Sequence, residues 1–291
     1  MAIQIFALVV VAVLSGTATV QPQSSEAAQV VADYLKMPYP EGDQGRSDRL
    51  ATLARLKMTP DEATDAIGEA LPQVKDPRRR AELAEALGRY VPTRKSATLL
   101  CELLKDPDEK VRWQAIHGLR MLARQTDRMG AQRIERAPLA AKVEGLVPYL
   151  VAAANDEVES NRICALYALA DSRDPQAVAE LRNRLRDSSE AVRLHAACFL
   201  TEYQDASGLP EMRAALSRLQ QTDADKHIDF YFEAERLLAS FERITGKSFG
   251  PIPMNPQLSS DTREIPRLEK SYRTLLTTWA QWWAWEPPGK P

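Results

Sequence analysis

A spaced pattern of four residues recurs in the middle of the chain and constrains its fold more than any other feature. An Asp is followed by an Arg six residues later, an Ala three residues after the Arg, and a Leu four residues after the Ala. The complete copies are Asp106, Arg112, Ala115, Leu119; Asp156, Arg162, Ala165, Leu169; and Asp187, Arg193, Ala196, Leu200. Patterns that return with the same internal spacing are typical of repeat proteins, in which each unit packs only on its neighbours.

The distance between copies indicates what one unit contains. The copies begin 50 and then 31 residues apart. About 31 residues accommodate two helices of three to four turns each with short connections. The longer spacing then contains an insertion, which we place at residues 124–138. Incomplete copies flank the set at Arg80, Leu83, Leu87 and at Tyr231, Ala234, Leu238.

Composition agrees with helices and excludes sheets. Valine and isoleucine together number 26, and seven of these lie in the first twenty residues. Buried strands need such β-branched residues, so too few remain for a sandwich, a barrel or a doubly wound sheet. We therefore predict an all-α chain, an α-solenoid of stacked helix pairs. Apolar spacing and Asp-Pro pairs such as Asp106-Pro107, which favour a helix start, place helices at 26–36, 47–57, 60–72, 77–90, 94–105, 107–123, 139–154, 157–170, 175–186, 189–202, 209–220, 226–245 and 266–285.

The amino-terminal residues have the pattern of an export signal. No charged side chain precedes Glu26, and Ile3 to Leu14 is almost wholly apolar. A stretch this short suits a signal-peptide core better than a membrane helix, which needs about 20 residues. Small residues follow, and we expect cleavage near Ala18, with Val20 as a second choice. We thus predict a signal peptide over residues 1–20 and an exported protein, periplasmic or extracellular; an uncleaved anchor or a buried first helix are the alternatives.

At the repeat, the chain resembles the HEAT-repeat family in its short bacterial form. The family pattern Asp-Pro-x-x-x-Val-Arg-x-x-Ala-x-x-x-Leu matches Asp106 to Leu119 position for position, whereas Asn161 and Tyr231 depart from it. The resemblance implies that the repeat Asp and Arg residues link neighbouring turns in a ladder with a structural role. It divides the chain into an N-terminal helical cap at 21–75, repeats at 76–245, and a linker with a tryptophan-rich capping helix at 246–291.

The C-terminal tryptophans form one stripe of a helix. Trp279, Trp282 and Trp283 stand at i, i+3 and i+4. A solenoid must cover the apolar face of its last repeat, so we predict that this helix is a cap. Exposed aromatic rings that stack on sugars or dock a partner are the alternative. The segment Thr245 to Gly250, with these tryptophans, is similar to the endings of exported bacterial HEAT-like proteins.

The sequence contains candidates for binding but no recognisable catalytic motif. Phosphate-loop, zinc-protease and nucleophile-elbow patterns are absent from it. The three cysteines, Cys101, Cys164 and Cys198, fit no zinc spacing and are expected to be buried, although one disulfide stays open. We therefore expect no enzyme activity, no cofactor and no metal. Some HEAT-like repeats belong to bilin lyases, so the resemblance leaves a lyase-like enzyme as the alternative.

The candidate binding face lies on the second helix of each pair, between the core positions. Its residues are Lys110, Gln114, His117, Tyr167, Asp171, His195 and Glu202. This mixed character, with a net charge of −2, predicts a protein or peptide partner and argues against nucleic acid. We expect a monomeric interaction or scaffold module whose partner the sequence does not identify.

Overall fold

The computed structural model describes residues 25–39, 45–124, 146–223, 229–258 and 262–285. These residues form helices and no β-strand, which confirms the predicted all-α solenoid. The α-helices are α1 (Glu26–Lys36), α2 (Arg46–Leu53), α3 (Pro60–Ala70), α4 (Pro77–Arg89), α5 (Arg94–Leu103), α6 (Glu109–Arg124), α7 (Leu146–Ala153), α8 (Glu159–Ser172), α9 (Gln176–Arg184), α10 (Glu190–Leu200), α11 (Leu209–Gln221), α12 (Phe230–Thr245) and α13 (Ile265–Trp285). The predicted signal peptide and most of the predicted insertion lie outside the described residues.

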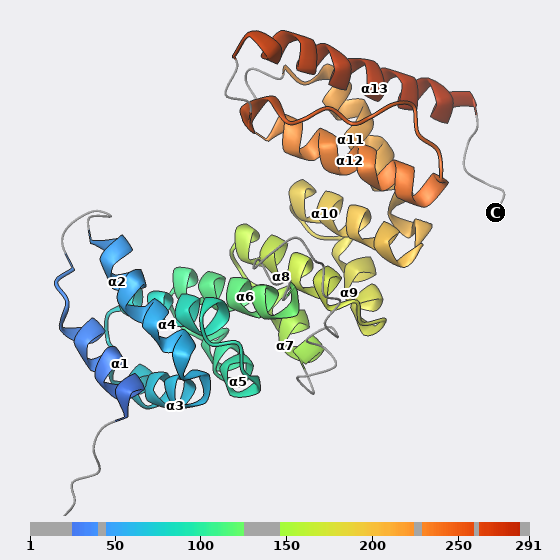
Figure 1. The fold of residues 1–291 in the computed structure, drawn as a ribbon. Coiled ribbons are helices and arrows are strands. Elements are labelled where there is room, and N and C mark those ends of the chain that lie inside the picture. Colours follow the sequence, from blue (N-terminus) through green and yellow to red (C-terminus); the bar gives the residue numbers. More distant parts are fainter. Residues whose placement is uncertain (1–24, 40–44, 125–145, 224–228, 259–261, 286–291) are drawn as a thin grey trace, which may run out of the picture.

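The helices stack in two layers that bend (Figure 1). One layer contains α2, α4, α6, α8, α10 and α12, each packed on the next. The other contains α3, α5, α7, α9 and α11, and α1 packs on α3. In Figure 1 helices α4, α6 and α8 face the inner side of the bend, while α3, α5 and α7 lie on its outer side. Within the described residues, no helix is both long and apolar enough to cross a membrane.

The repeat alanines and leucines bring the second helices together. Ala115, Ala165 and Ala196 are fully buried, as are the leucines four residues after each. Helices α4 and α6 approach closely, because a Cβ atom on Gly88 would stand only 2.3 Å from the Cα atom of Gly118. Small side chains at these positions therefore set the spacing of the inner layer.

Two residues of the repeat, Asp106 and Asn161, make contacts that the repeat pattern alone does not predict. Asp106 does not cap α6, because that helix begins at Glu109 and the Asp108 carboxylate accepts the amides of Lys110 and Val111. The Asp106 carboxylate instead accepts the Asp108 amide and pairs with an arginine of the preceding repeat. Asn161, at the usual valine position, is buried, and its side-chain amide donates to the Glu109 carbonyl of α6 at 3.3 Å.

Helix α13 covers the last helix pair. It packs on both α11 and α12, and Trp279 and Trp283 are 1% and 2% exposed. Their rings stand 5.1 and 4.8 Å from the ring of Phe241 on α12. Trp282 is partly exposed and Trp285 projects into solvent. Trp279 and Trp283 therefore fill the end of the core, whereas Trp282 lies at its edge.

Candidate interaction groove

The repeat Asp and Arg side chains form a ladder along the stack. Arg80 binds Asp106, Arg112 binds Asp156, and Arg162 binds Asp187, each through two nitrogen–oxygen contacts of 2.6–3.1 Å. A third nitrogen of each of these arginines donates a hydrogen bond to a main-chain carbonyl. In Arg112, for example, Nη1 lies 3.0 Å from the Asp106 carbonyl oxygen. The series changes at Arg193, whose partner is Glu211 on α11. These charges are occupied by inter-repeat contacts, so they are not available to a ligand.

The ladder also keeps its carboxylates ionised. Burial alone would raise the pKa of Asp156, but the hydrogen bonds from Arg112 and from the Val158 amide outweigh it and hold that pKa below its ordinary value. The same balance lowers the pKa of Asp106 and of Asp187. The ladder is therefore a set of partly buried ion pairs that link successive repeats.

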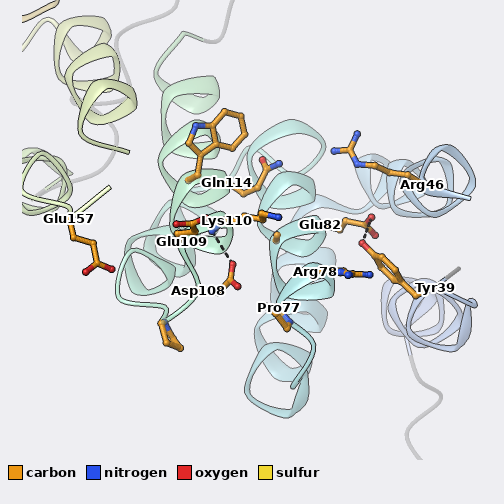
Figure 2. Close-up of a pocket in the computed structure, with 13 residues that line it drawn as sticks. Tyr39, Arg46, Pro77, Arg78, Glu82, Asp108, Glu109, Lys110, Gln114 and Glu157 are labelled. Atoms are coloured by element: carbon orange, nitrogen blue, oxygen red, sulfur yellow. Dashed lines mark hydrogen bonds between the residues drawn. The ribbon is translucent and has the colours of Figure 1, made fainter. Parts of the chain in front are cut away.

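A groove of about 1050 Å³ crosses α2, α4 and α6 (Figure 2). Lys110 and Gln114 of the predicted binding face line it, next to Trp113, which is 37% exposed. His117 lies one turn further along α6, and its ring stacks on the Trp113 indole at 5.1 Å with an interplanar angle of 3°. The sequence reasoning missed Trp113, although positions 110, 113, 114 and 117 have the spacing of one helix face.

A buried ion pair closes one end of the groove. Arg49 of α2 and Glu82 of α4 are 1% and 4% exposed, and Arg49 Nη2 lies 3.0 Å from Glu82 Oε1. The hydroxyls of Tyr34 and Tyr39 donate to the same carboxylate at 3.0 and 2.9 Å. The Arg49 guanidinium also lies 3.7 Å from the centre of the Tyr39 ring. The pair therefore holds Tyr39 at the groove wall and anchors α1 and α2 to the first repeat.

The remaining residues of the predicted face do not join the groove. Tyr167 and Asp171 of α8 contact Arg120, whose guanidinium lies 4.1 Å from the Tyr167 ring centre and whose Nε lies 2.9 Å from Asp171 Oδ2. His195 of α10 packs edge-on against Tyr167 at 5.7 Å, and Arg236 of α12 donates a hydrogen bond to the Tyr167 hydroxyl. These contacts form a cluster between helices. Glu202, further along, is exposed beside Tyr203.

Burial gives His195 an unusual titration. Its ring nitrogen Nδ1 lies 2.7 Å from the Ala191 carbonyl. Burial, together with the nearby positive charge of Arg236, lowers the pKa of His195 to about 3. The imidazole is therefore neutral at physiological pH and serves as an aromatic packing group. Cys101, Cys164 and Cys198 are buried and free, as expected for packing residues.

Comparison with known proteins identifies the repeat. The family model described as HEAT repeats matches residues 46–128 and 144–228, more than half of the chain. No curated protein matches by sequence. Among solved structures, YibA of Escherichia coli is similar at 14% identity over 84% of this chain and 81% of its own, with a TM-score of 0.45.

Two further solved structures are similar. A designed armadillo repeat protein in complex with the peptide (KR)4 matches at 18% identity over 75% of this chain and 100% of its own, with a TM-score of 0.42. Human deoxyhypusine hydroxylase in complex with glycerol matches at 16% identity over 88% of this chain and 84% of its own, with a TM-score of 0.29. Given the extent of the family match, with the Asp–Arg ladder and the two-layer stack, the chain belongs to the HEAT-repeat family.

Proposed function

We propose that this chain is an exported, monomeric interaction module that binds a protein partner through the groove over α2, α4 and α6 and has no catalytic activity of its own. The observation that carries the proposal is that the inner layer contains two sets of side chains, one that links the repeats and one that does not. In the ladder, the repeat Asp and Arg side chains are paired with each other. The groove, in contrast, contains side chains that the stacking of repeats does not require, among them the exposed indole of Trp113.

The chemistry of the groove suits a polypeptide. Tryptophan on a rigid helix supplies a large contact area at little entropic cost, and such residues carry much of the binding energy in protein interfaces. Gln114 also lines the groove, next to Trp113. Its side-chain amide has both donors and an acceptor, the groups that a main chain of an extended segment can pair with.

The test uses a peptide library displayed against the full mature chain. Peptides selected on the wild type should lose at least tenfold in affinity on Trp113→Ala. The matched control is Tyr149→Ala, because Tyr149 is similarly exposed, at 41%, on α7 and outside the groove. Binding that survives the first substitution, or that is lost equally in both, would contradict the assignment to this groove.

Export is tested separately from binding. We expect the mature protein in the extracytoplasmic fraction, with an N-terminus just after Ala18. Recovery of the full-length chain from the cytosol would overturn this part of the proposal. Sedimentation at several concentrations tests the monomeric state.

Carbohydrate binding at the C-terminal end is a second candidate function. Trp285 is 89% exposed, and the neighbouring Trp282 is partly exposed with the Lys247 ammonium 5.1 Å from its ring centre. Trp279 and Trp283 are too buried to stack on a sugar. A glycan-array signal that disappears in a Trp282→Ala, Trp285→Ala variant would support this function.

A further inference from the structure

The groove has charges of opposite sign at its two ends (Figure 2). Arg46 and Arg78 lie beside Tyr39, towards α1 and α2, whereas Glu109 and Glu157 lie towards α8. Asp108 and Lys110, which have opposite charges, also line the groove next to Glu109, so the end towards α8 has a net negative charge. Electrostatic complementarity selects partners and fixes their register even where it adds little affinity. A groove with separated charges therefore distinguishes the two directions in which an extended chain can lie.

Some of these charged side chains form ion pairs within the described part of the protein, and others do not. Arg46 pairs with Glu85 at 2.6 Å. Arg78 is exposed and forms no ion pair with any other described residue, and its closest described ring contact is Tyr39, at 5.8 Å. At the opposite end Glu109 is exposed and has no ion pair within the described part of the chain. Glu157 contacts Arg112 at 3.2 Å, but its side chain is 82% exposed.

The spacing of the helices gives the length of the ligand. Packed helices lie about 8–10 Å apart, so the path from α2 over α4 and α6 to the start of α8 measures roughly 24–30 Å. An extended chain rises about 3.3 Å per residue, which corresponds to about eight residues. Trp113 and Gln114 stand within this path.

We propose that the groove binds an extended peptide of about eight residues that has acidic side chains at one end, a central apolar residue, and basic side chains at the other. The acidic end lies against Arg46 and Arg78, the apolar residue packs on Trp113, and the basic end lies against Glu109 and Glu157. The inference rests on the proposed function, because it assigns the partner's chemistry to the same groove.

The experiment compares end-capped synthetic peptides that share one neutral, leucine-containing centre. They carry aspartates then lysines, lysines then aspartates, lysines at both ends, or aspartates at both ends. Affinity for the full mature chain is measured by fluorescence polarisation at low salt and again at high salt. One of the two bipolar peptides should bind at least tenfold more tightly than its reverse and than both single-sign peptides, and salt should reduce the difference.

A charge-reversal variant makes the assignment specific. In Arg78→Glu, Glu109→Lys the net charge of the protein stays the same, but the reversed charges oppose those of Arg46 and Glu157, so the preference for one peptide direction should disappear. Circular dichroism establishes that the variant is folded. Preference for a single-sign peptide, or a direction preference that persists in the variant, would overturn the inference while leaving a peptide-binding groove. Failure of all four peptides to bind, when library peptides do bind through Trp113, would also overturn it; absence of any groove binding would overturn the proposed function as well.

Discussion

Arg236 of α12 donates a hydrogen bond to the Tyr167 hydroxyl of α8, although the two helices are separated in the stack by α10. The guanidinium also lies 4.9 Å from the Tyr167 ring centre and 5.9 Å from that of Phe199 on α10. One arginine therefore joins three successive second helices. In a solenoid each unit otherwise touches only its neighbours, so we expect this contact to restrain the bend of the stack.

The Arg236 contact should be measurable as a coupling energy. Arg236→Ala is expected to lower the free energy of unfolding by about 1–2 kcal/mol, since a charge-assisted hydrogen bond and a cation–π contact are lost. Tyr167→Phe should cost about 1 kcal/mol. In a double-mutant cycle measured by urea unfolding, the two effects should not add. Additive effects, with an unchanged radius of gyration in Arg236→Ala, would show that the contact does not restrain the stack.

Removal of a ladder arginine should be more damaging than removal of an exposed one. Arg112 and Asp156 have side chains that are 11% and 7% exposed. Arg112→Ala leaves the partly buried carboxylate without its main partner, so we expect a loss of about 2–3 kcal/mol. Arg182, which is 60% exposed, also binds an aspartate, Asp205. Arg182→Ala should cost less than about 1 kcal/mol, and equal losses in thermal or urea unfolding would contradict the ladder's role.

His195 should make stability depend on pH well above the range of the carboxylates. Its folded pKa of about 3 lies below the value of about 6.5 expected in the unfolded chain. Between these values the unfolded state binds more protons, so stability falls as pH decreases from about 6.5, by at most about 1.4 kcal/mol per pH unit. His195→Gln should flatten the stability profile between about pH 6.5 and pH 4.5. An unchanged slope in urea titrations would be inconsistent with a neutral imidazole packed between α8, α10 and α12.

The ladder aspartates affect the stability of the protein in a lower pH range than His195 does. Their pKa values are lowered in the folded state, so their contribution is complete above the unfolded value of about 3.9 and is lost as pH falls through the folded values. In Arg112→Ala, part of this acid-dependent loss should be missing. The histidine and the aspartates can thus be separated by pH.

The sequence predicted the parts of this structure that repeat. Residues such as Asp156 and Arg162 recur with a fixed spacing because every unit packs on its neighbours in the same way. The ladder and the helices can therefore be recognised from the sequence. Tyr39 and Glu82 are 43 residues apart, and Arg236 and Tyr167 are 69 apart. No periodicity connects such pairs, because they depend on where the bend of the stack brings unrelated helices. The wall of the groove and the Tyr167 cluster therefore became apparent only in three dimensions.

Gly88 should tolerate no side chain, although alanine is normally the better helix former. A Cβ atom there would stand 2.3 Å from the Gly118 Cα atom, which is backbone and cannot rotate away. Gly88→Ala should therefore lower stability by about 1–3 kcal/mol through overpacking of α4 on α6. Gly68 is the matched control, since its added Cβ would be 3.4 Å from a flexible Leu99 methyl group. Gly68→Ala should be neutral or stabilising by up to about 1 kcal/mol.

The three tryptophans Trp279, Trp282 and Trp285 should separate capping from surface binding. Trp279 is 1% exposed between Phe241 and Phe249, so Trp279→Ala should cost about 3–5 kcal/mol by opening a cavity at the end of the core. Trp282→Ala should lower the melting temperature by several degrees, because its ring packs on Trp279 at 5.4 Å while staying partly exposed. Trp285, at 89% exposed, should be replaceable by alanine with a change within about 0.5 kcal/mol. Calorimetry of the three variants checks this order, and a stable Trp279→Ala variant would refute the assignment of α13 as a cap.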